Sequence, residues 1–253
     1  MRRAVALITR KPHKVWLDFL STFDNYDVYI IIDDNTKNYD KIYGNNYTKL
    51  NFIQVDSDDC ENNGFTESSV ATGLPRIMAW DKAMYYFSHE NTKYEHIWYF
   101  EDDVFLFSEE ILSKIDNEFE SSDLLTRNHS IKNEYDTFGW WHWNQVMGKI
   151  DLPWAHSLIC ICRISNRLLG KVREYANVNK RTFFIESILN TLAIHNDFII
   201  GTPIEFDTVV QGDMLGLEIT PNKKMCVFHP YKDLDKQSEI REYLHNYFHQ
   251  KDY

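Results

Sequence analysis

The chain has 253 residues, of which 43% are hydrophobic and 15% aromatic, so it can bury the core of one large domain. Six prolines and nine glycines exclude a collagen-like or disordered composition. The formal charge of -11 argues against nucleic acid as a partner, because binding a polyanion requires clustered Lys and Arg. An anionic small ligand would therefore need a local cation.

The cysteines and the N-terminal segment bear on the compartment. Four cysteines occur without a C-x-x-C spacing, which excludes a zinc ribbon or a thioredoxin motif; they are Cys60, Cys160, Cys162 and Cys226. We expect free thiols that pack in the core. The apolar stretch in "MRRAVALITRK" is too short for a signal peptide, and no run approaches a membrane span. These features predict a chain without a transmembrane segment in a reducing, cytoplasmic compartment.

The first part of the chain alternates between strand and helix patterns. Continuous apolar runs at 4–8 and 28–32 are rich in β-branched residues, as in parallel strands that are covered on both faces. Between them, apolar residues recur at helical spacing over 15–23, which completes a βαβ unit. We expect a third strand at 51–55 and a long polar loop at 56–73.

A further helix, strand and helix follow this loop. Pro75 can occupy the first turn of a helix with a buried stripe that consists of Ile77, Trp80, Ala83, Met84 and Phe87. The next predicted strand, 97–100, runs directly into three acids. Ser108 fits as the N-cap of a helix that extends to Phe119.

The second half of the chain has a less regular pattern. The stretch 121–157 shows no clear period, whereas 157–164 has the pattern of a strand. Helices are expected at 166–176 and 182–195, and a closing helix after Asp233. This order of elements predicts one α/β domain with a Rossmann-like, mostly parallel central sheet flanked by helices.

Two of the predicted strands end in acids. Asp33 and Asp34 follow one strand, and Glu101–Asp103 follow another in "IWYFEDDVF". Ligands of open α/β sheets bind beyond the carboxyl ends of the strands. Two unit charges about 4 Å apart repel by roughly 4 kcal/mol at an effective dielectric of about 20, so gathered carboxylates need a cation. Mg²⁺ or Mn²⁺ suits this chemistry, because such ions are shared between carboxylates and substrate phosphates.

A simpler explanation competes with a metal site. Acids after a strand are also typical of a solvated turn or a helix N-cap, and this alternative stays open for Asp33 and Asp34. The acids at Glu101–Asp103 differ, because Val104 and Phe105 follow at once and return the chain to the core. The sequence therefore favours a functional site at Glu101–Asp103.

With these residues in place, the sequence resembles a GT-A-fold glycosyltransferase that uses a nucleotide sugar. In that family an apolar strand ends in a D-x-D-type motif, one form of which is E-D-D followed by an apolar residue, as at 101–104. The segments "LPRIMAWDKAMYYF" and "YEHIWYF" resemble the helix and strand that lead into the motif. The resemblance covers about 4–230 as an order of elements, and it is close in residues only at 74–107.

The resemblance implies a fold and an activity. The fold would be one GT-A-like domain with a nucleotide-sugar half at about 1–107, a mixed acceptor half at about 108–230 and a C-terminal helical tail at about 231–253. The activity would move a sugar from a nucleotide diphosphate sugar to a hydroxyl group of a glycan or another acceptor. UDP is the implied nucleotide, with GDP as the nearest competitor, and Mn²⁺ or Mg²⁺ the implied ion.

The resemblance also assigns roles around the metal. Asp103, the last acid of the motif, would bind the divalent ion, while Glu101 and Asp102 would face the ribose, the donor sugar or metal-bound water. Many members supply a second ligand, often a histidine, from a late segment. His229 in "KMCVFHPYKD" matches this position, or it is a packed core residue, and Lys232 could meet the diphosphate.

Further positions are implied for the nucleotide. Thr9 and Arg10 follow the first strand, where the loop of this family lies against the nucleotide. Asp33 or Asp34 would contact the base or ribose. Arg76 could touch the donor phosphate or sugar, or it is a surface arginine at the start of a helix.

An inverting enzyme of this fold needs a carboxylate that accepts the proton of the acceptor hydroxyl. Glu186 in "TFFIESILN" stands at the start of a predicted helix, where the dipole favours the ionised form. A solvent-facing helix glutamate is the alternative, and Asp207 and Asp213 are reserves. Three tryptophans could form an aromatic platform for the acceptor, or pack in the core; they are Trp140, Trp141 and Trp143.

Other classes of protein fit the sequence less well. A HAD-like phosphatase needs an aspartate nucleophile in a D-x-D-x-T or V motif, which neither "DDNT" nor "EDDV" provides. A sugar nucleotidyltransferase requires a glycine-rich, basic N-terminal loop, and "LITRKPHK" has no glycine. A non-catalytic carbohydrate-binding or scaffold module of the same fold remains an alternative to the enzyme.

Overall fold

The computed structural model describes residues 3–69, 76–135, 139–140, 142–212 and 218–249. Within these ranges one sheet is formed by β1 (Arg3–Thr9), β2 (Asp27–Ile32), β3 (Leu50–Ile53), β4 (His96–Glu101), β5 (Leu124–Lys132), β6 (Trp154–Ser165) and β7 (Ile200–Gly201). The α-helices are α1 (Lys14–Leu20), α2 (Tyr39–Tyr43), α3 (Ser57–Asn62), α4 (Ala79–Tyr85), α5 (Glu110–Glu118), α6 (Asn166–Asn179), α7 (Ile185–His195) and α8 (Leu234–His249). A π-helical turn, Tyr86–Glu90, extends α4, and single 3-10 turns occur at Trp143–Gln145, Ile204–Phe206 and Pro221–Lys223.

The strands are ordered β3-β2-β1-β4-β6-β5-β7. β1 pairs in parallel with β2 and β4, and β2 with β3, so these four strands run in one direction. β6 is antiparallel to β4 and to β5, and β7 is parallel to β5. The sheet is therefore mostly parallel with β6 reversed. The carboxyl ends of β1, β2 and β4 lie side by side, and the acids follow them there. We call this end of the parallel strands the acidic edge of the sheet.

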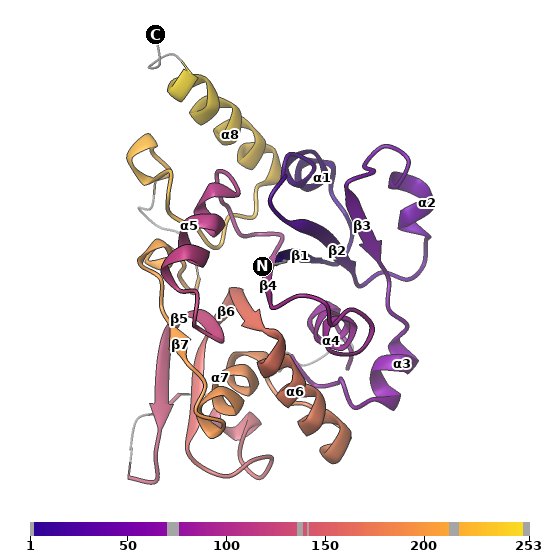
Figure 1. Cartoon of the computed structure of the whole chain (residues 1–253), viewed down its shortest axis with the longest axis vertical. Coiled ribbons are helices and arrows are strands. Elements are labelled where there is room, and N and C mark those ends of the chain that lie inside the picture. Colours follow the sequence, from indigo (N-terminus) through magenta and orange to yellow (C-terminus); the bar gives the residue numbers. More distant parts are fainter. Residues whose placement is uncertain (1–2, 70–75, 136–138, 141, 213–217, 250–253) are drawn as a thin grey trace.

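Helices cover both faces of the sheet (Figure 1). The side chains of β1 alternate between two cores, with Ala4 and Ala6 on one face and Val5 and Leu7 on the other. The first core is closed by α4, α6 and α7, and the second by α1 and α5. Strands buried on both faces explain the continuous apolar runs in the sequence. The architecture is the α/β fold that the order of predicted elements indicates.

Several elements differ from the expectation. The predicted loop at 56–73 contains α3, whose first turn is capped by Asp56 Oδ1 accepting from Asp58 N over 2.9 Å. The stretch 121–157 contains β5, which the pattern hides because most of its residues are polar and its partner is the long strand β6. α4 begins at Ala79 instead of Pro75, which lies outside the described residues.

α8 is the helix expected after Asp233. Asp233 Oδ1 accepts a hydrogen bond from Lys236 N over 3.1 Å, which caps the first turn. In Figure 1, α8 lies beside α1 at one end of the molecule and extends away from the sheet. Among the described helices, none combines the length and hydropathy needed to cross a bilayer.

Candidate active site at the end of strand β4

The E-D-D motif forms a tight turn at the carboxyl end of β4. Glu101 is the last residue of the strand, and Val104 N donates to Glu101 O over 3.2 Å. Val104 and Phe105 are buried, so the chain returns to the core immediately after the acids. The two apolar flanks therefore fix the backbone on both sides of the motif, as the sequence pattern predicts.

The late segment that carries His229 is paired to this turn by backbone hydrogen bonds. Phe105 and Phe228 form an antiparallel bridge with N–O distances of 2.8 and 2.9 Å. Tyr231 N donates to Asp103 O over 2.6 Å, and Val210 N donates to His229 O over 3.1 Å. These bonds place the imidazole of His229 opposite the carboxylate of Asp103.

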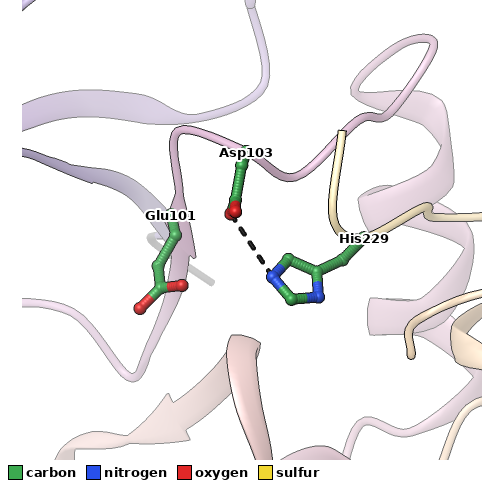
Figure 2. Close-up of side chains that lie close together, drawn as sticks. All are labelled: Glu101, Asp103 and His229. Atoms are coloured by element: carbon green, nitrogen blue, oxygen red, sulfur yellow. Dashed lines mark ion pairs between the residues drawn. The ribbon is translucent and has the colours of Figure 1, made fainter. Parts of the chain in front are cut away.

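Three side chains with the chemistry of a metal site lie close together here, and Figure 2 shows Asp103 and His229 pointing toward one another with Glu101 beside them. One ligand atom from each of Glu101, Asp103 and His229 lies within 4.8 Å of the others. His229 Nε2 is 3.3 Å from Asp103 Oδ1, an oxygen that is buried without a hydrogen bond. His229 Nδ1 lies 2.9 Å from Val210 O. Because a carbonyl only accepts, Nδ1 carries a proton, and the Nε2 of the neutral ring presents its lone pair to Asp103.

Two acceptor atoms, His229 Nε2 and Asp103 Oδ1, face each other here, and a cation between them would stabilise the arrangement. Burial lowers the pKa of His229, but the close approach of Nε2 to the Asp103 carboxylate and the negative charge of that group raise it more, so the net pKa is above its usual range. A proton on Nε2 is one cation that satisfies the pair. A divalent ion is another, and two carboxylates with one imidazole suit Mn²⁺ or Mg²⁺. The residues present therefore fit the implied metal.

Glu101 is held by a tryptophan of α4. Trp80 Nε1 donates to Glu101 Oε1 over 2.8 Å. Burial and the negative charge of Asp103, against the hydrogen bond from Trp80, raise the pKa of Glu101 to about 7. A bound cation would remove this cost by favouring the ionised carboxylate.

Asp102 is not among the three clustered residues and is bonded to β1 and α1 instead. Its Oδ2 accepts from Thr9 Oγ1 over 2.5 Å, and its carbonyl accepts from Trp16 Nε1 over 2.8 Å. Burial raises the pKa of Asp102, while the bond from Thr9 lowers it. Thr9, which was expected beside the nucleotide, is buried, and its hydroxyl donates to Asp102 in this structure.

A cavity of about 260 Å³ lies at this cluster, and Glu186 lines it together with Glu101 and His229. Glu186 lies in the first turn of α7. We expected the helix dipole to favour its ionised form, but burial and then the charge of Glu101 raise its pKa to about 7. Desolvation therefore outweighs the dipole at this position. A carboxyl group that titrates near neutral pH is suited to general base catalysis.

The residues expected at the nucleotide lie at the same sheet edge, beyond β1 and β2. Asp33 accepts from the buried Lys82, whose Nζ is 2.7 Å from the Asp33 carbonyl and 3.1 Å from its Oδ1. Asp34 accepts from Thr36 and Tyr39, and these bonds hold the pKa of Asp34 below its usual range. Arg10 is exposed.

Two expected phosphate ligands stand apart from the ligand cluster. Arg76 is exposed and pairs with Glu61 over 2.8 Å and with Glu67 over 3.6 Å, as a surface arginine would. Lys232 is exposed and follows the segment of His229, and no ion pair joins it to a described residue.

The expected acceptor residues are divided. Trp143 is buried and packs against Trp154 at a ring distance of 5.9 Å, as a core tryptophan does. Trp140 is partly exposed; it stacks on His156 at 4.2 Å and lies nearly parallel to Phe184, which lines the cavity. Asp207 is exposed beside Arg127 and is absent from the cavity lining. Trp141 and Asp213 lie outside the described residues.

The structure adds residues that the sequence does not single out for the site. Trp80 was expected only in a buried stripe, yet its N–H orients Glu101. Gln211 lines the cavity, although it belongs to no motif that the sequence shows. The buried Lys82 forms an ion pair with Asp33. Lys82 does not belong to the apolar stripe predicted for this helix, so its burial could be seen only in the structure, where the buried charge has Asp33 as its partner.

The mostly parallel sheet, covered by helices on both faces, is a GT-A-like α/β fold, which known glycosyltransferases share. The acids lie at the carboxyl ends of its parallel strands. The galactosyltransferase LgtC, solved with donor and acceptor sugar analogues, superposes with a TM-score of 0.51 at 10% identity over 95% of each chain. An active-site mutant of LgtC gives a TM-score of 0.50 at 10% identity, covering 96% of this chain and 95% of that chain.

A 4-diphosphocytidyl-2C-methyl-D-erythritol synthase from Anaerococcus prevotii aligns with 95% of this chain over 96% of its own length, at 12% identity. Its TM-score of 0.48 is too low to support a statement about the fold. No protein-family model matches the sequence, and no curated protein matches it either. Identities this low establish a shared fold. The activity has to be argued from the site itself.

Proposed function

We propose that the chain is a metal-dependent glycosyltransferase that moves a sugar from a nucleotide diphosphate sugar, UDP-sugar in the first instance, to a hydroxyl group of a glycan or another acceptor. One observation carries the proposal. Glu101, Asp103 and His229 lie close together at the carboxyl end of β4, and Glu186 lines the cavity beside them. The GT-A-like fold supports the same class of reaction.

In this proposal Asp103, His229 and Glu101 hold Mn²⁺ or Mg²⁺. The ion would act as a Lewis acid that stabilises the charge of the departing nucleoside diphosphate. Trp80 orients Glu101, and the Val210 carbonyl fixes the tautomer of His229. Asp33 and Asp34, at the end of the neighbouring strand, are placed to accept hydrogen bonds from ribose or base. The positive charge of the ion would then offset the repulsion between the donor diphosphate and the carboxylates at this end of the sheet.

Glu186 acts as the base in this reaction. The acceptor oxygen forms a bond to the anomeric carbon of the donor, while the bond from that carbon to the diphosphate oxygen breaks and its electron pair leaves with the diphosphate. The hydroxyl proton passes to the carboxylate of Glu186. Attack from the face opposite the leaving group inverts the configuration. A pKa of about 7 leaves a useful fraction of Glu186 ionised at neutral pH.

A panel of nucleotide sugars with Mn²⁺ tests the proposal, with thermal shift and donor hydrolysis as readouts. We expect stabilisation by UDP plus Mn²⁺ that is lost in Asp103→Ala. Asp207→Ala is the matched control, because this exposed carboxylate is not among the residues that line the cavity. A response to nucleotide without metal dependence would contradict the metal role. No response to any nucleotide would favour a non-catalytic module of the same fold.

A further inference from the structure

The turn that carries Asp102 and Asp103 is held from behind by two helices that contribute no ligand. The carbonyl oxygen of Asp102 accepts from Trp16 Nε1 of α1 over 2.8 Å and from Gln237 Nε2 of α8 over 3.4 Å. α1 and α8 pack against each other at this end of the molecule (Figure 1). The backbone next to a proposed metal ligand is therefore fixed by side chains.

Gln237 is the connecting side chain on α8. It is fully buried, and each of its polar atoms has a partner. Besides the Asp102 carbonyl, Nε2 donates to Tyr231 O over 2.7 Å, and Oε1 accepts from Arg241 Nη2 over 3.0 Å. A buried amide that loses such partners costs free energy, so these bonds hold Gln237 in one orientation.

The two carbonyls that Gln237 contacts belong to different segments of the site. Asp102 directly precedes the ligand Asp103, and Tyr231 lies just beyond the ligand His229. The two segments are also joined directly, by Tyr231 N donating to Asp103 O over 2.6 Å. One amide group thus bonds to the backbone of both segments.

Arg241 anchors α8 in this position. Its guanidinium carbon lies 3.9 Å from the ring centroid of Phe19 and 4.8 Å from that of Phe105, which are cation–π distances. Arg241 Nε also donates to Leu106 O over 3.1 Å, so a second bond joins α8 to the chain that follows the motif. α8 is consequently fixed on the segment 102–106 at two points along its length.

We propose that Gln237 is a positioning residue of the metal site, which sets the distance between Asp103 and His229 by tying their two backbone segments to α8. The inference rests on the proposed metal site. In this proposal α8 supplies no metal ligand, but it affects metal binding through Gln237.

The test is a Mn²⁺ titration of the full chain without nucleotide, followed by electron paramagnetic resonance. Gln237→Met keeps the volume and removes the bonds to the carbonyls of Asp102 and Tyr231. We expect its dissociation constant for Mn²⁺ to rise about 10-fold or more, as for other groups that orient ligands, and the spectrum of the bound ion to change. Gln237→Glu is the second variant, for the case that the first does not fold. Its carboxylate keeps Arg241 as a partner but cannot donate.

Tyr26→Phe is the matched control, because it removes a buried hydrogen bond to Asp116 of α5, which also pairs with Arg3 at the amino end of β1. It should bind Mn²⁺ as the wild type does. Wild-type affinity and spectrum in a folded Gln237 variant would overturn the inference alone. Equal weakening in Tyr26→Phe would also overturn it, since general destabilisation would then explain the loss. A wild-type chain that binds no Mn²⁺ would instead overturn the proposed function.

Discussion

Trp80 Nε1 donates a hydrogen bond to Glu101 Oε1 over 2.8 Å, from α4 to the carboxyl end of β4. The bond occupies one carboxylate oxygen and leaves the other for the cation that we propose Glu101 shares with Asp103 and His229. Partners of this kind fix the orientation of a ligand and raise metal affinity. The helix that precedes the motif in the sequence therefore takes part in the site.

Trp80→Phe should weaken Mn²⁺ binding while preserving the fold. The substitution keeps an aromatic ring against Tyr99 and removes the N–H donor. We expect a loss of about 10-fold in Mn²⁺ affinity, at the lower end of the effect of such partners. Trp98→Phe is the control, because Trp98 Nε1 donates to Asp116 of α5, which is not among the residues that could hold the ion. Equal affinity in Trp80→Phe and the wild type would show that the bond does not orient a ligand.

Glu186→Gln should abolish transfer and spare nucleotide binding. Loss of a general base costs about 100-fold or more in turnover. The pH profile provides the second readout. Burial raises the pKa of Glu186 to about 7, so the base is protonated below that value and activity should increase as the pH rises through it. Initial rates over a pH series measure this. Unchanged turnover in Glu186→Gln would remove Glu186 from the mechanism.

Lys82→Met should destabilise the fold, because it leaves Asp33 at the sheet edge without its buried partner. Breaking a buried ion pair costs about 3–5 kcal/mol, and we expect the lower end because the Asp33 side chain is 21% exposed. Lys14→Met breaks an exposed lysine–aspartate pair and should change the stability little. Urea unfolding of both variants measures the difference. Equal losses would show that burial does not decide the strength of these pairs.

Asp123 should make the stability depend on pH in the acid range. Burial raises the pKa of Asp123, but hydrogen bonds from Arg167, Ile199 N and Ser165 lower it more, to below its usual range. The stabilisation is present above the unfolded pKa of about 3.9 and is lost as the pH falls through the folded value. Asp123→Asn should flatten this part of a melting-temperature series. An unchanged slope would assign the acid sensitivity to other groups.

The elements that position the site could be predicted because their signals are local. β1, β2 and β4 are continuous apolar runs, since helices cover both faces of the sheet. β5 could not be predicted in the same way. Its outer residues are polar, and what makes it a strand is its pairing with β6, which no local pattern encodes.

The site itself was predictable in part. Glu101, Asp103 and His229 were identified individually from motif and resemblance, but their convergence depends on the bridge between Phe105 and Phe228. The pKa of Glu186 was expected in the wrong direction, because burial is a tertiary property and here exceeds the effect of the helix dipole. Trp80 and Gln237 had no signal at all, since a side-chain N–H acquires a role only from what packs against it.

The pairing of the 228–231 segment with the 103–105 turn has a consequence for biosynthesis. The four neighbouring parallel strands come from the first part of the chain and can associate while the ribosome is still translating the rest. A nascent polypeptide that has not yet emerged as far as His229 lacks the imidazole opposite Asp103. At the proposed metal site, cation binding would therefore have to wait until the 228–231 segment has been synthesised, and products that terminate before His229 should not bind manganese beside Asp103.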